Sequence, residues 1–386
     1  MRVGGLLLLT AAATAAASGC SPTASRNHVP PPALEGAIRK GREFLFSSQN
    51  ADGSWGSARC TKDLNISAPV PGAHLAFRAA CSALCLSSLI STSDGSGAER
   101  AALGRGEAWL LENLPQVRRP STDVLYNVWT HAYALKTLLA LRRLPGDEIR
   151  LARIETEIRH QIDRLSRNES VDGGWGYYDM RTRSQKPGTD STSFITATAL
   201  LALREARDAG FEVPQTLVDR ALASLRRQRK PDLSYLYGEY LRMRPLMGIN
   251  VPAGSLGRSQ TCNAALRCWG DPSITDDRLE EWLDRLVNRN GWLDRGRKFP
   301  VPHESWFGVA GYFFYYGHYY AGYCIDLLPE DRRQRHRDAL AGILVPLQEK
   351  DGRWWDYPLY DYGPYWGTPM ALMALARCRP AAAHAP

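Results

Sequence analysis

The sequence predicts an all-α fold in which six helical hairpins close into a double-walled (α/α)6 toroid. Charged amphipathic segments alternate along the chain with segments that are poor in charge, and a short motif recurs between them. Strand patterns are weak, because the aromatic residues lie in loops with Gly, Pro and Asp instead of in alternating runs. The charge-poor helices should therefore form an inner ring that the charged helices enclose.

Each hairpin is expected to contain one charged outer helix followed by one apolar inner helix. The outer helices should begin near Leu34, Glu99, Asp147, Pro214, Thr275 and Glu330. The inner helices are expected over 73–92, 124–143, 190–208, 258–269, 309–328 and 367–378. Because the hairpins are evenly spaced with no second linker between them, we expect a single toroid domain over residues 34–380.

Residues 1–19 have the features of an export signal. Arg2 precedes an apolar, Ala-rich run that is too short for a permanent membrane span. The run ends in Ala-Ser-Gly-Cys, which resembles a bacterial lipobox and implies cleavage before Cys20 and acylation of that residue. We expect residues 20–33 to be a flexible tether and 381–386 a disordered tail. The membrane is then a partner through a lipid anchor, and the chain is a cell-envelope lipoprotein at the periplasmic or outer-membrane face. An ordinary secretory signal is the alternative, and it also places the chain outside the cytosol.

Composition restricts the partners and cofactors. The formal net charge is +8, and the basic runs at 226–230 and 332–337 lie on polar helix faces, which is typical of a solvated surface and not of a nucleic-acid module. The seven cysteines after Cys20 show no CxxC pair and no His/Cys cluster with zinc spacing. The sequence also has no Gly-rich phosphate loop, HExxH motif or GxSxG motif, so neither a metal nor an organic cofactor is expected.

Four short segments mark turns between helices: "QNADGSWG" at 49–56, "VDGGWGYYD" at 171–179, "RNGWLD" at 289–294 and "QEKDGRWWDYP" at 348–358. Gln can bond to the backbone, Asp can cap the next turn, Gly permits a tight bend and Trp packs across helices. These segments resemble the glutamine–tryptophan repeats of squalene and oxidosqualene cyclases. The body of the chain is similar to the toroids of terpenoid cyclases and protein prenyltransferases. Since the repeats staple the fold, we assign no chemistry to them.

The catalytic signatures of these families are missing. The DxDD acid of the proton-initiated cyclases does not occur, and the acidic segment "TDDRLEEW" at 275–282 is typical of a capped helix start. The segments at 257–269 and 313–324 resemble inner helices of the prenyltransferase beta subunit. Ala264 and Leu266, however, stand at the positions of two zinc ligands, and only His318 matches the third. The resemblance therefore implies the toroid without thiol prenylation.

Polar residues on the apolar inner helices and aromatic residues in nearby loops form the candidate site. We expect catalytic roles for His131, Asp190 and His318, although Asp190 also suits a helix N-cap. Arg258 at a helix start is unfavourable for the helix dipole, so a ligand carboxylate or phosphate, or a loop acid, should hold it. Substrate-binding roles are expected for Tyr126, Asn127, Arg258, His303, Glu304, Trp306, Tyr315, Tyr319, Tyr365 and Trp366.

Three functions stay open, and catalysis itself is one of the open points. An aromatic pocket with these polar groups suits a cation-like hydrocarbon intermediate or a stacked sugar ring. The first hypothesis, which the resemblance favours, is an exported lipoprotein that binds or transforms a lipid or isoprenoid-like ligand in a central cavity. The second is a carbohydrate-active toroid, a lyase or hydrolase, with two acid/base groups facing each other in an open groove. The third is a noncatalytic lipoprotein that binds a ligand or partner and whose centre is filled by its own aromatic side chains.

Overall fold

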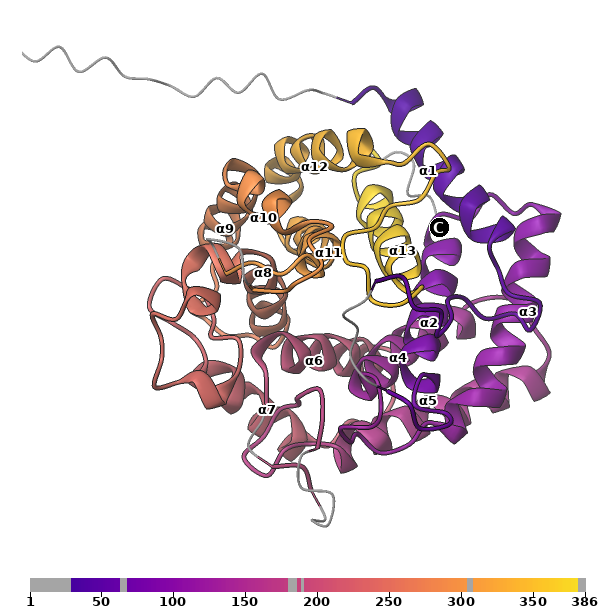
Figure 1. Cartoon of the computed structure of the whole chain (residues 1–386), viewed down its shortest axis with the longest axis horizontal. Coiled ribbons are helices and arrows are strands. Elements are labelled where there is room, and N and C mark those ends of the chain that lie inside the picture. Colours follow the sequence, from indigo (N-terminus) through magenta and orange to yellow (C-terminus); the bar gives the residue numbers. More distant parts are fainter. Residues whose placement is uncertain (1–28, 63–67, 180–185, 189–190, 304–307, 381–386) are drawn as a thin grey trace, which may run out of the picture.

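The computed structural model describes residues 29–62, 68–179, 186–188, 191–303 and 308–380. Within these residues the chain is helical, with two isolated β-bridges and no named strand. Figure 1 looks down the ring and shows an inner circle of helices inside an outer one. The inner helices are α2 (Leu75–Ser91), α4 (Asn127–Arg142), α6 (Ser193–Asp208), α8 (Pro252–Cys268), α11 (Phe313–Asp326) and α13 (Gly363–Ala376).

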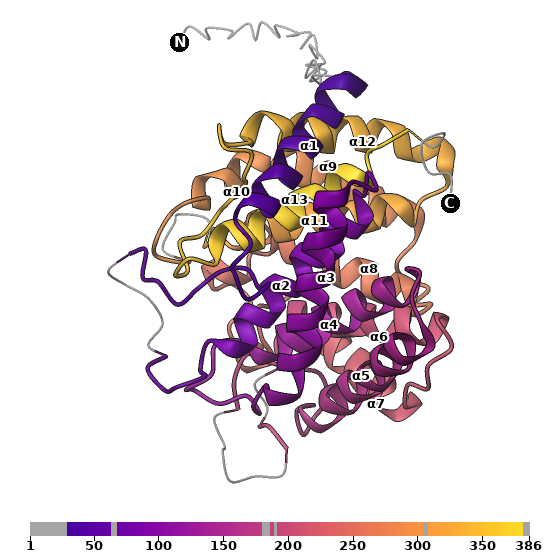
Figure 2. The ribbon, with the colours of Figure 1, turned by 90° about the vertical axis from the view of Figure 1, so that its right-hand side faces the viewer.

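The inner helices contact one another in chain order, and α13 contacts α2, which closes the ring. The outer helices are α1 (Pro31–Ser47), α3 (Gly97–Asn113), α5 (Glu148–Arg167), α7 (Gln215–Arg227), α9 (Asp276–Asn288) and α12 (Glu330–Leu344). Figure 2 shows α1 and α13, the first and last helices, in the same part of the ring, and they are in contact. The predicted (α/α)6 toroid is thus confirmed. No described helix has both the length and the apolar character that a membrane crossing requires.

Three of the repeat turns have the same geometry. Their tryptophans, Trp55, Trp175 and Trp354, are fully buried. Each indole N–H donates to the carbonyl oxygen ten residues earlier, at 2.9, 2.8 and 2.9 Å respectively. The backbone N–H of the same three residues donates to an inner-helix hydroxyl, from Ser82, Thr196 and Thr368 respectively. Each tryptophan therefore joins an outer helix to the following inner helix, as the sequence predicts for a staple.

The segment "RNGWLD" does not behave as a repeat turn. It forms most of a short helix, α10 (Asn290–Gly296), and Trp292 is only half-buried. A turn like that of the repeats lies instead at residues 232–235, in the preceding hairpin between α7 and α8. The N–H and hydroxyl of Ser234 donate to Asp232 Oδ1 at 3.1 and 2.6 Å, as Ser54 does to Asp52 at 3.0 and 2.6 Å. Tyrosine and leucine replace the tryptophan and glycine of the motif there, so the pattern is hidden in the sequence.

Several inner helices begin a few residues away from their predicted starts; α11, for example, begins four residues later than expected. Helix α8 begins six residues earlier than expected, and α13 begins four residues earlier. Pro252 and Pro364 occupy the first turns of these helices, where the missing N–H of proline leaves no helical hydrogen bond unmade. Both helices are consequently longer than their charge-poor stretches suggest. As a result, Arg258 lies inside α8 and not at its start.

Substitution of a repeat glycine by alanine should destabilise the ring. Gly352 has a φ of +91°, and a Cβ there would lie against the backbone carbonyl of Lys40 on α1. We expect Gly352→Ala to lower the free energy of unfolding by about 2–4 kcal/mol, through backbone strain and the clash. Gly95→Ala is the matched control, because Gly95 also has a positive φ, +69°, but open space around it. Urea denaturation of both variants tests this, and equal losses would contradict the role of the close contact.

Candidate ligand-binding site

A pocket opens at the end of the ring where the inner helices begin. It leaves about 40 Å³ of free volume, roughly the space for a few water molecules. Eight of its eleven lining residues are aromatic, and they come from α2, α4, α13 and the loops that precede α6, α11 and α13. The lining residues are Phe77, Tyr126, Trp129, Tyr177, Tyr312, Asp356, Tyr357, Leu359, Tyr362, Gly363 and Trp366.

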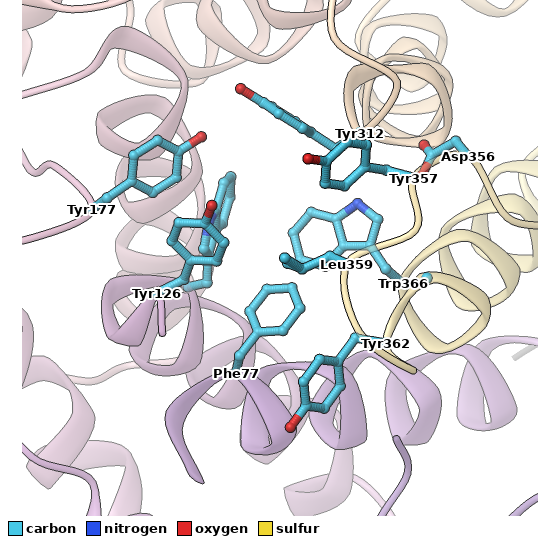
Figure 3. Close-up of a pocket in the computed structure, with 11 residues that line it drawn as sticks. Phe77, Tyr126, Tyr177, Tyr312, Asp356, Tyr357, Leu359, Tyr362 and Trp366 are labelled. Atoms are coloured by element: carbon cyan, nitrogen blue, oxygen red, sulfur yellow. The ribbon is translucent and has the colours of Figure 1, made fainter. Parts of the chain in front are cut away.

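Aromatic rings face one another across this pocket, as Figure 3 shows. The ring of Trp366 lies 5.5 Å from that of Phe77 in a stacked arrangement and 5.3 Å from that of Trp129 at a steep angle. Tyr126 and Tyr177 stand together on the opposite wall, with ring centroids 4.7 Å apart. A cage of ring faces and edges of this kind stabilises an apolar ligand and, through the ring quadrupoles, a positive charge on it.

The backbone around the mouth is strained. Among the described non-glycine residues, five have a positive φ, and four of them lie in or next to the pocket wall. Tyr126 (49°) lines the pocket, and Tyr360 (47°) follows the lining residue Leu359. Lys298 (65°) and His303 (65°) bond to the lining residues Asp356 and Tyr312. Tyr126 precedes the first residue of α4, so its conformation places the tyrosine ring at the pocket wall. Such conformations cost on the order of 1–3 kcal/mol each and concentrate at functional sites. The strained residues of the described chain thus gather at this mouth of the toroid.

Asp356 is the acid of the pocket, and sequence reasoning missed it. Its side chain is fully buried, and Oδ2 accepts a hydrogen bond of 3.0 Å from the backbone N–H of Tyr315. Oδ1 has no hydrogen-bond partner in the described part of the chain. Burial raises the pKa of this carboxyl group to about 7, against the lowering effects of the Tyr315 N–H and of Arg297. Near neutral pH a large share of Asp356 is therefore protonated and able to donate.

A line of hydroxyl groups runs along the wall from His303. The Nδ1 atom of His303 lies 3.0 Å from the Gly308 carbonyl oxygen, and Nε2 lies 2.9 Å from the Tyr312 hydroxyl. The Tyr237 hydroxyl lies 3.2 Å from those of Tyr312 and Tyr177. Burial lowers the pKa of His303 to about 4, so the ring is neutral near pH 7. Nδ1 then donates to the carbonyl, and Nε2 accepts from Tyr312, which lines the pocket.

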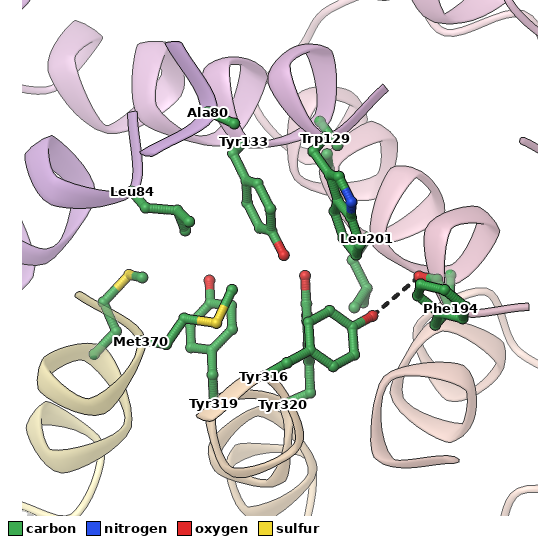
Figure 4. Close-up of a cluster of buried hydrophobic side chains, with 14 of the residues drawn as sticks. Ala80, Leu84, Trp129, Tyr133, Phe194, Leu201, Tyr316, Tyr319, Tyr320 and Met370 are labelled. Atoms are coloured by element: carbon green, nitrogen blue, oxygen red, sulfur yellow. Dashed lines mark hydrogen bonds between the residues drawn. The ribbon is translucent and has the colours of Figure 1, made fainter. Parts of the chain in front are cut away.

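The centre of the ring below the pocket is closed by side chains. Figure 4 shows Trp129, Tyr133, Tyr316, Tyr319 and Tyr320 converging there from α4 and α11. The Tyr316 hydroxyl donates to the carbonyl of residue 194 at 3.0 Å. This packing makes the pocket a shallow site at one mouth and not a channel through the toroid.

Two of the residues expected to be catalytic lie outside this pocket. Nδ1 of His131 is 2.7 Å from Gln161 Oε1 on the outer helix α5. Nδ1 of His318 is 2.6 Å from the Phe314 carbonyl, and its Nε2 is 3.0 Å from Asn290 Oδ1 on α10. Both imidazoles thus face the outer wall. The third expected catalytic residue, Asp190, lies outside the described residues.

Some of the other expected site residues lie in the pocket, and the rest make packing or backbone contacts elsewhere in the toroid. Tyr126 and Trp366 line the pocket, and Tyr315 holds Asp356 through its N–H. The Asn127 side chain donates to the Arg118 carbonyl at 2.6 Å, Tyr319 contributes to the closed centre, and Tyr365 stacks on Phe44 of α1. Glu304, Trp306 and Cys20 lie outside the described residues.

Arg258 is held by backbone carbonyls, whereas the sequence suggested a ligand carboxylate or phosphate, or a loop acid. Its guanidinium donates to the carbonyls of Tyr235, Ile249 and Gly254. Its charge also lies 5.8 Å from the ring centroids of Tyr237 and Phe313. Burial lowers the pKa of Arg258 to about 10, which still leaves it charged at neutral pH. It therefore positions a loop and does not contact the pocket.

No protein-family model and no curated protein sequence matches this chain. Solved structures match its fold. The apo type II terpene cyclase MstE from Scytonema has a TM-score of 0.52 at 14% identity, over 89% of this chain and 97% of that one. An inactive variant of the α-1,6-mannanase GH76A from Salegentibacter sp. HEL1_6, in complex with α-1,6-mannotriose, has a TM-score of 0.56 at 10% identity, over 90% and 100%. An α-amylase from Clostridium perfringens gives 0.55 at 9% identity, over 90% and 98%. At these identities the shared property is the α/α toroid fold.

Proposed function

We propose that the mouth pocket binds the end of an isoprenoid-like hydrocarbon and that Asp356 transfers a proton to it. The observation that carries this proposal is a buried carboxyl group, with one oxygen unpartnered, at the edge of a pocket whose other walls are aromatic or apolar. A carboxylic acid kept neutral by burial is suited to general-acid chemistry near pH 7. The small free volume suits the end of a chain.

The proton transfer needs no other reactant. The π electrons of a C=C bond take the Asp356 proton, so a C–H bond forms, the O–H bond breaks, and a carbocation and a carboxylate result. The ring faces of Trp129 and Trp366 stabilise the cation. The cation then loses a proton from a carbon next to the charged one, and the neutral Tyr312–His303 pair can accept this proton. Proton exchange with solvent restores the pair and the Asp356 carboxylic acid. The overall reaction is an isomerisation or cyclisation.

Carbohydrate chemistry is the second candidate, and it is supported by the toroid mannanase and amylase with the same fold. Glycoside hydrolysis ordinarily uses two carboxyl groups about 5–10 Å apart. Among the described lining residues, Asp356 is the only carboxylate. The mostly aromatic lining with a single carboxylate thus favours a hydrocarbon ligand over a sugar. If no substrate is turned over, a noncatalytic binding role is the third candidate. We further propose that Cys20 carries a lipid and holds the chain at the cell envelope, which the intact mass of the mature chain tests.

Deuterium incorporation tests the proposed chemistry. The chain is incubated in D₂O with a panel of linear polyprenols and squalene, and products are analysed by gas chromatography and mass spectrometry. We expect a product with one deuterium on carbon, formed faster at pH 6 than at pH 8 because the acid must be protonated. Asp356→Asn should reduce its formation by about 10²–10⁴-fold.

Asp361→Asn is the control for this experiment. Asp361 lies in the same loop, but it is paired with Arg59 at 3.0 Å and is not among the pocket-lining residues. It should keep the activity. A reaction that survives Asp356→Asn would remove the acid from the mechanism, while turnover of α-1,6-mannotriose but of no polyene would favour the carbohydrate candidate.

A further inference from the structure

The connection between α7 and α8 presents an unusual group of apolar side chains to solvent. Met243 is 85% exposed, Leu246 84%, Tyr240 56% and Met247 47%. Half of the strongly exposed large apolar side chains of the described chain thus fall within eight consecutive residues. Isolated exposed apolar residues need no explanation, but a group of this kind marks a contact surface. We call residues 240–247 the apolar loop, and Figure 1 shows the connection that contains it at the rim of the ring, between the labels α7 and α8.

The apolar loop is an ordered series of turns. The backbone N–H groups of Leu241, Arg242, Arg244 and Met247 each donate to a carbonyl three residues earlier. The side chain of Asn250 closes its base, because Nδ2 donates to the Arg244 carbonyl at 2.9 Å and Oδ1 accepts from the Tyr237 N–H at 2.8 Å. Arg258 bonds to the backbone on both sides of the loop, at Tyr235 and Ile249. The exposure of these side chains is therefore imposed by the structure.

The charge of the apolar loop indicates the partner. Arg242 and Arg244 alternate with the apolar side chains, and the loop contains no acidic residue. Arg242 is 59% exposed in its side chain and lies 3.9 Å from Glu239, at the outer limit of an ion pair. Apolar side chains that enter the interface while guanidinium groups meet phosphate are typical of proteins that bind an anionic bilayer surface.

The apolar loop is continuous with the wall of the ligand pocket. Tyr237, three residues before it, contacts the hydroxyls of Tyr177 and Tyr312, and both of these residues line the pocket. Gly248, directly after it, packs against Gly308, near His303. A partner surface that binds the apolar loop would therefore lie on the side of the ring where the pocket opens.

We propose that the apolar loop inserts Tyr240, Met243 and Leu246 into the surface of an anionic lipid bilayer. This contact is made by the folded ring itself and is separate from any lipid on Cys20. It places the mouth of the pocket beside the bilayer. The proposal does not rest on the proposed function, because the loop binds the bilayer whatever the pocket holds.

A site-specific fluorescent probe tests the insertion in the full chain. An environment-sensitive fluorescent amino acid is incorporated at position 246 and, as the matched control, at position 149 on α5, where Ile149 is 82% exposed. The chain is mixed with vesicles of phosphatidylcholine and phosphatidylglycerol, with and without brominated acyl chains. We expect a blue shift and quenching by bromine at position 246 and neither at position 149. The control separates insertion of the loop from simple tethering of the chain by its N-terminus.

Charge is tested in the same assay. Replacing both arginines, Arg242→Gln and Arg244→Gln, or using pure phosphatidylcholine, should reduce the fraction of inserted probe at position 246 by about tenfold. Equal response of the probes at 246 and 149, or no response at 246, would overturn the proposal. A blue shift at 246 that depends on protein concentration and needs no vesicles would also overturn it, since a second copy of the chain then covers the loop.

Discussion

Replacing Arg258 by methionine should lower the free energy of unfolding by about 3–5 kcal/mol, the range for a broken buried hydrogen-bond network. Arg258 is fully buried and bonds to the carbonyls of Tyr235 and Ile249, on the two sides of the connection between α7 and α8. Methionine fills much of the same volume but has no donor. Two buried carbonyl oxygens would then lose their partner, at a cost of about 1–3 kcal/mol each.

Two further variants make this prediction specific. Arg258→Lys keeps the charge but loses the planar fork of donors, so its loss of stability should be intermediate. Arg167→Met is the control: it removes an exposed arginine that pairs with Asp163, four residues earlier on the same helix. It should change the free energy of unfolding by less than about 0.5 kcal/mol. Hydrogen exchange should show that Arg258→Met loses protection first at residues 235–249. Uniform loss of protection over the ring would mean that Arg258 supports the core and not this connection.

The fold should also weaken steeply in mild acid, because two buried histidines must stay neutral. Burial lowers the pKa of His131 and of His318 to about 4, below the ordinary value near 6.5. Between pH 6.5 and pH 4 each of these histidines is protonated in the unfolded chain and neutral in the folded chain. Each histidine therefore removes about 1.4 kcal/mol of stability per pH unit as the pH falls from 6.5 to 4. His303, which is less deeply buried, acts in the same direction.

Asp356 opposes part of this effect. Its pKa is raised in the folded state, so its contribution is fully present below the ordinary pKa of Asp and is lost as the pH rises through about 7. As the pH falls, the stability gained through Asp356 offsets about as much as one buried histidine loses. Two of the three histidines stay unopposed, so we expect the net loss of stability to be roughly 4–5 kcal/mol between pH 6.5 and 4.5.

Urea denaturation across this pH range measures the slope. His318→Gln should make the slope shallower by about 1.4 kcal/mol per pH unit. His160→Gln is the control variant, because the side chain of His160 is mostly exposed on α5. A slope that is the same in all three proteins would contradict the assignment of acid sensitivity to the buried imidazole.

The sequence was sufficient for the fold because the fold depends on local patterns. Each inner helix is poor in charge, and each clear repeat places a tryptophan, a glycine and an acid at fixed spacing, which is enough to predict the hairpins and their order. The exceptions are instructive. Residues 232–235 make the same serine–aspartate hydrogen bonds as the turn at 52–54 without its tryptophan, and "RNGWLD" has the tryptophan but forms a helix.

The site was harder to predict because burial and direction are tertiary properties. His131 and His318 stand on charge-poor helices, yet the face on which each lies turns toward the outer wall. Asp356 follows a repeat tryptophan pair and resembles an ordinary loop acid in sequence. Its burial depends on α11 and on the backbone of Lys298, whose N–H donates to its carbonyl at 2.5 Å. The one available signal was its position in a loop rich in tyrosine and tryptophan.

Closure of the ring through α1 and α13 also sets the order in which the molecule is completed. The last repeat turn reaches the first helix, since the Gln348 side chain donates at 2.9 Å to the carbonyl of Ala37, 311 residues away in sequence. During synthesis α1 therefore lacks its neighbour α13 until nearly the whole chain has been made. Until then the face of α1 that packs against α13 is exposed to solvent. Contacts at this separation are the slowest to form. The interface between α1 and α13 is consequently the last part of the ring to assemble. In a truncated chain it would stay exposed and could associate with a second copy of the chain.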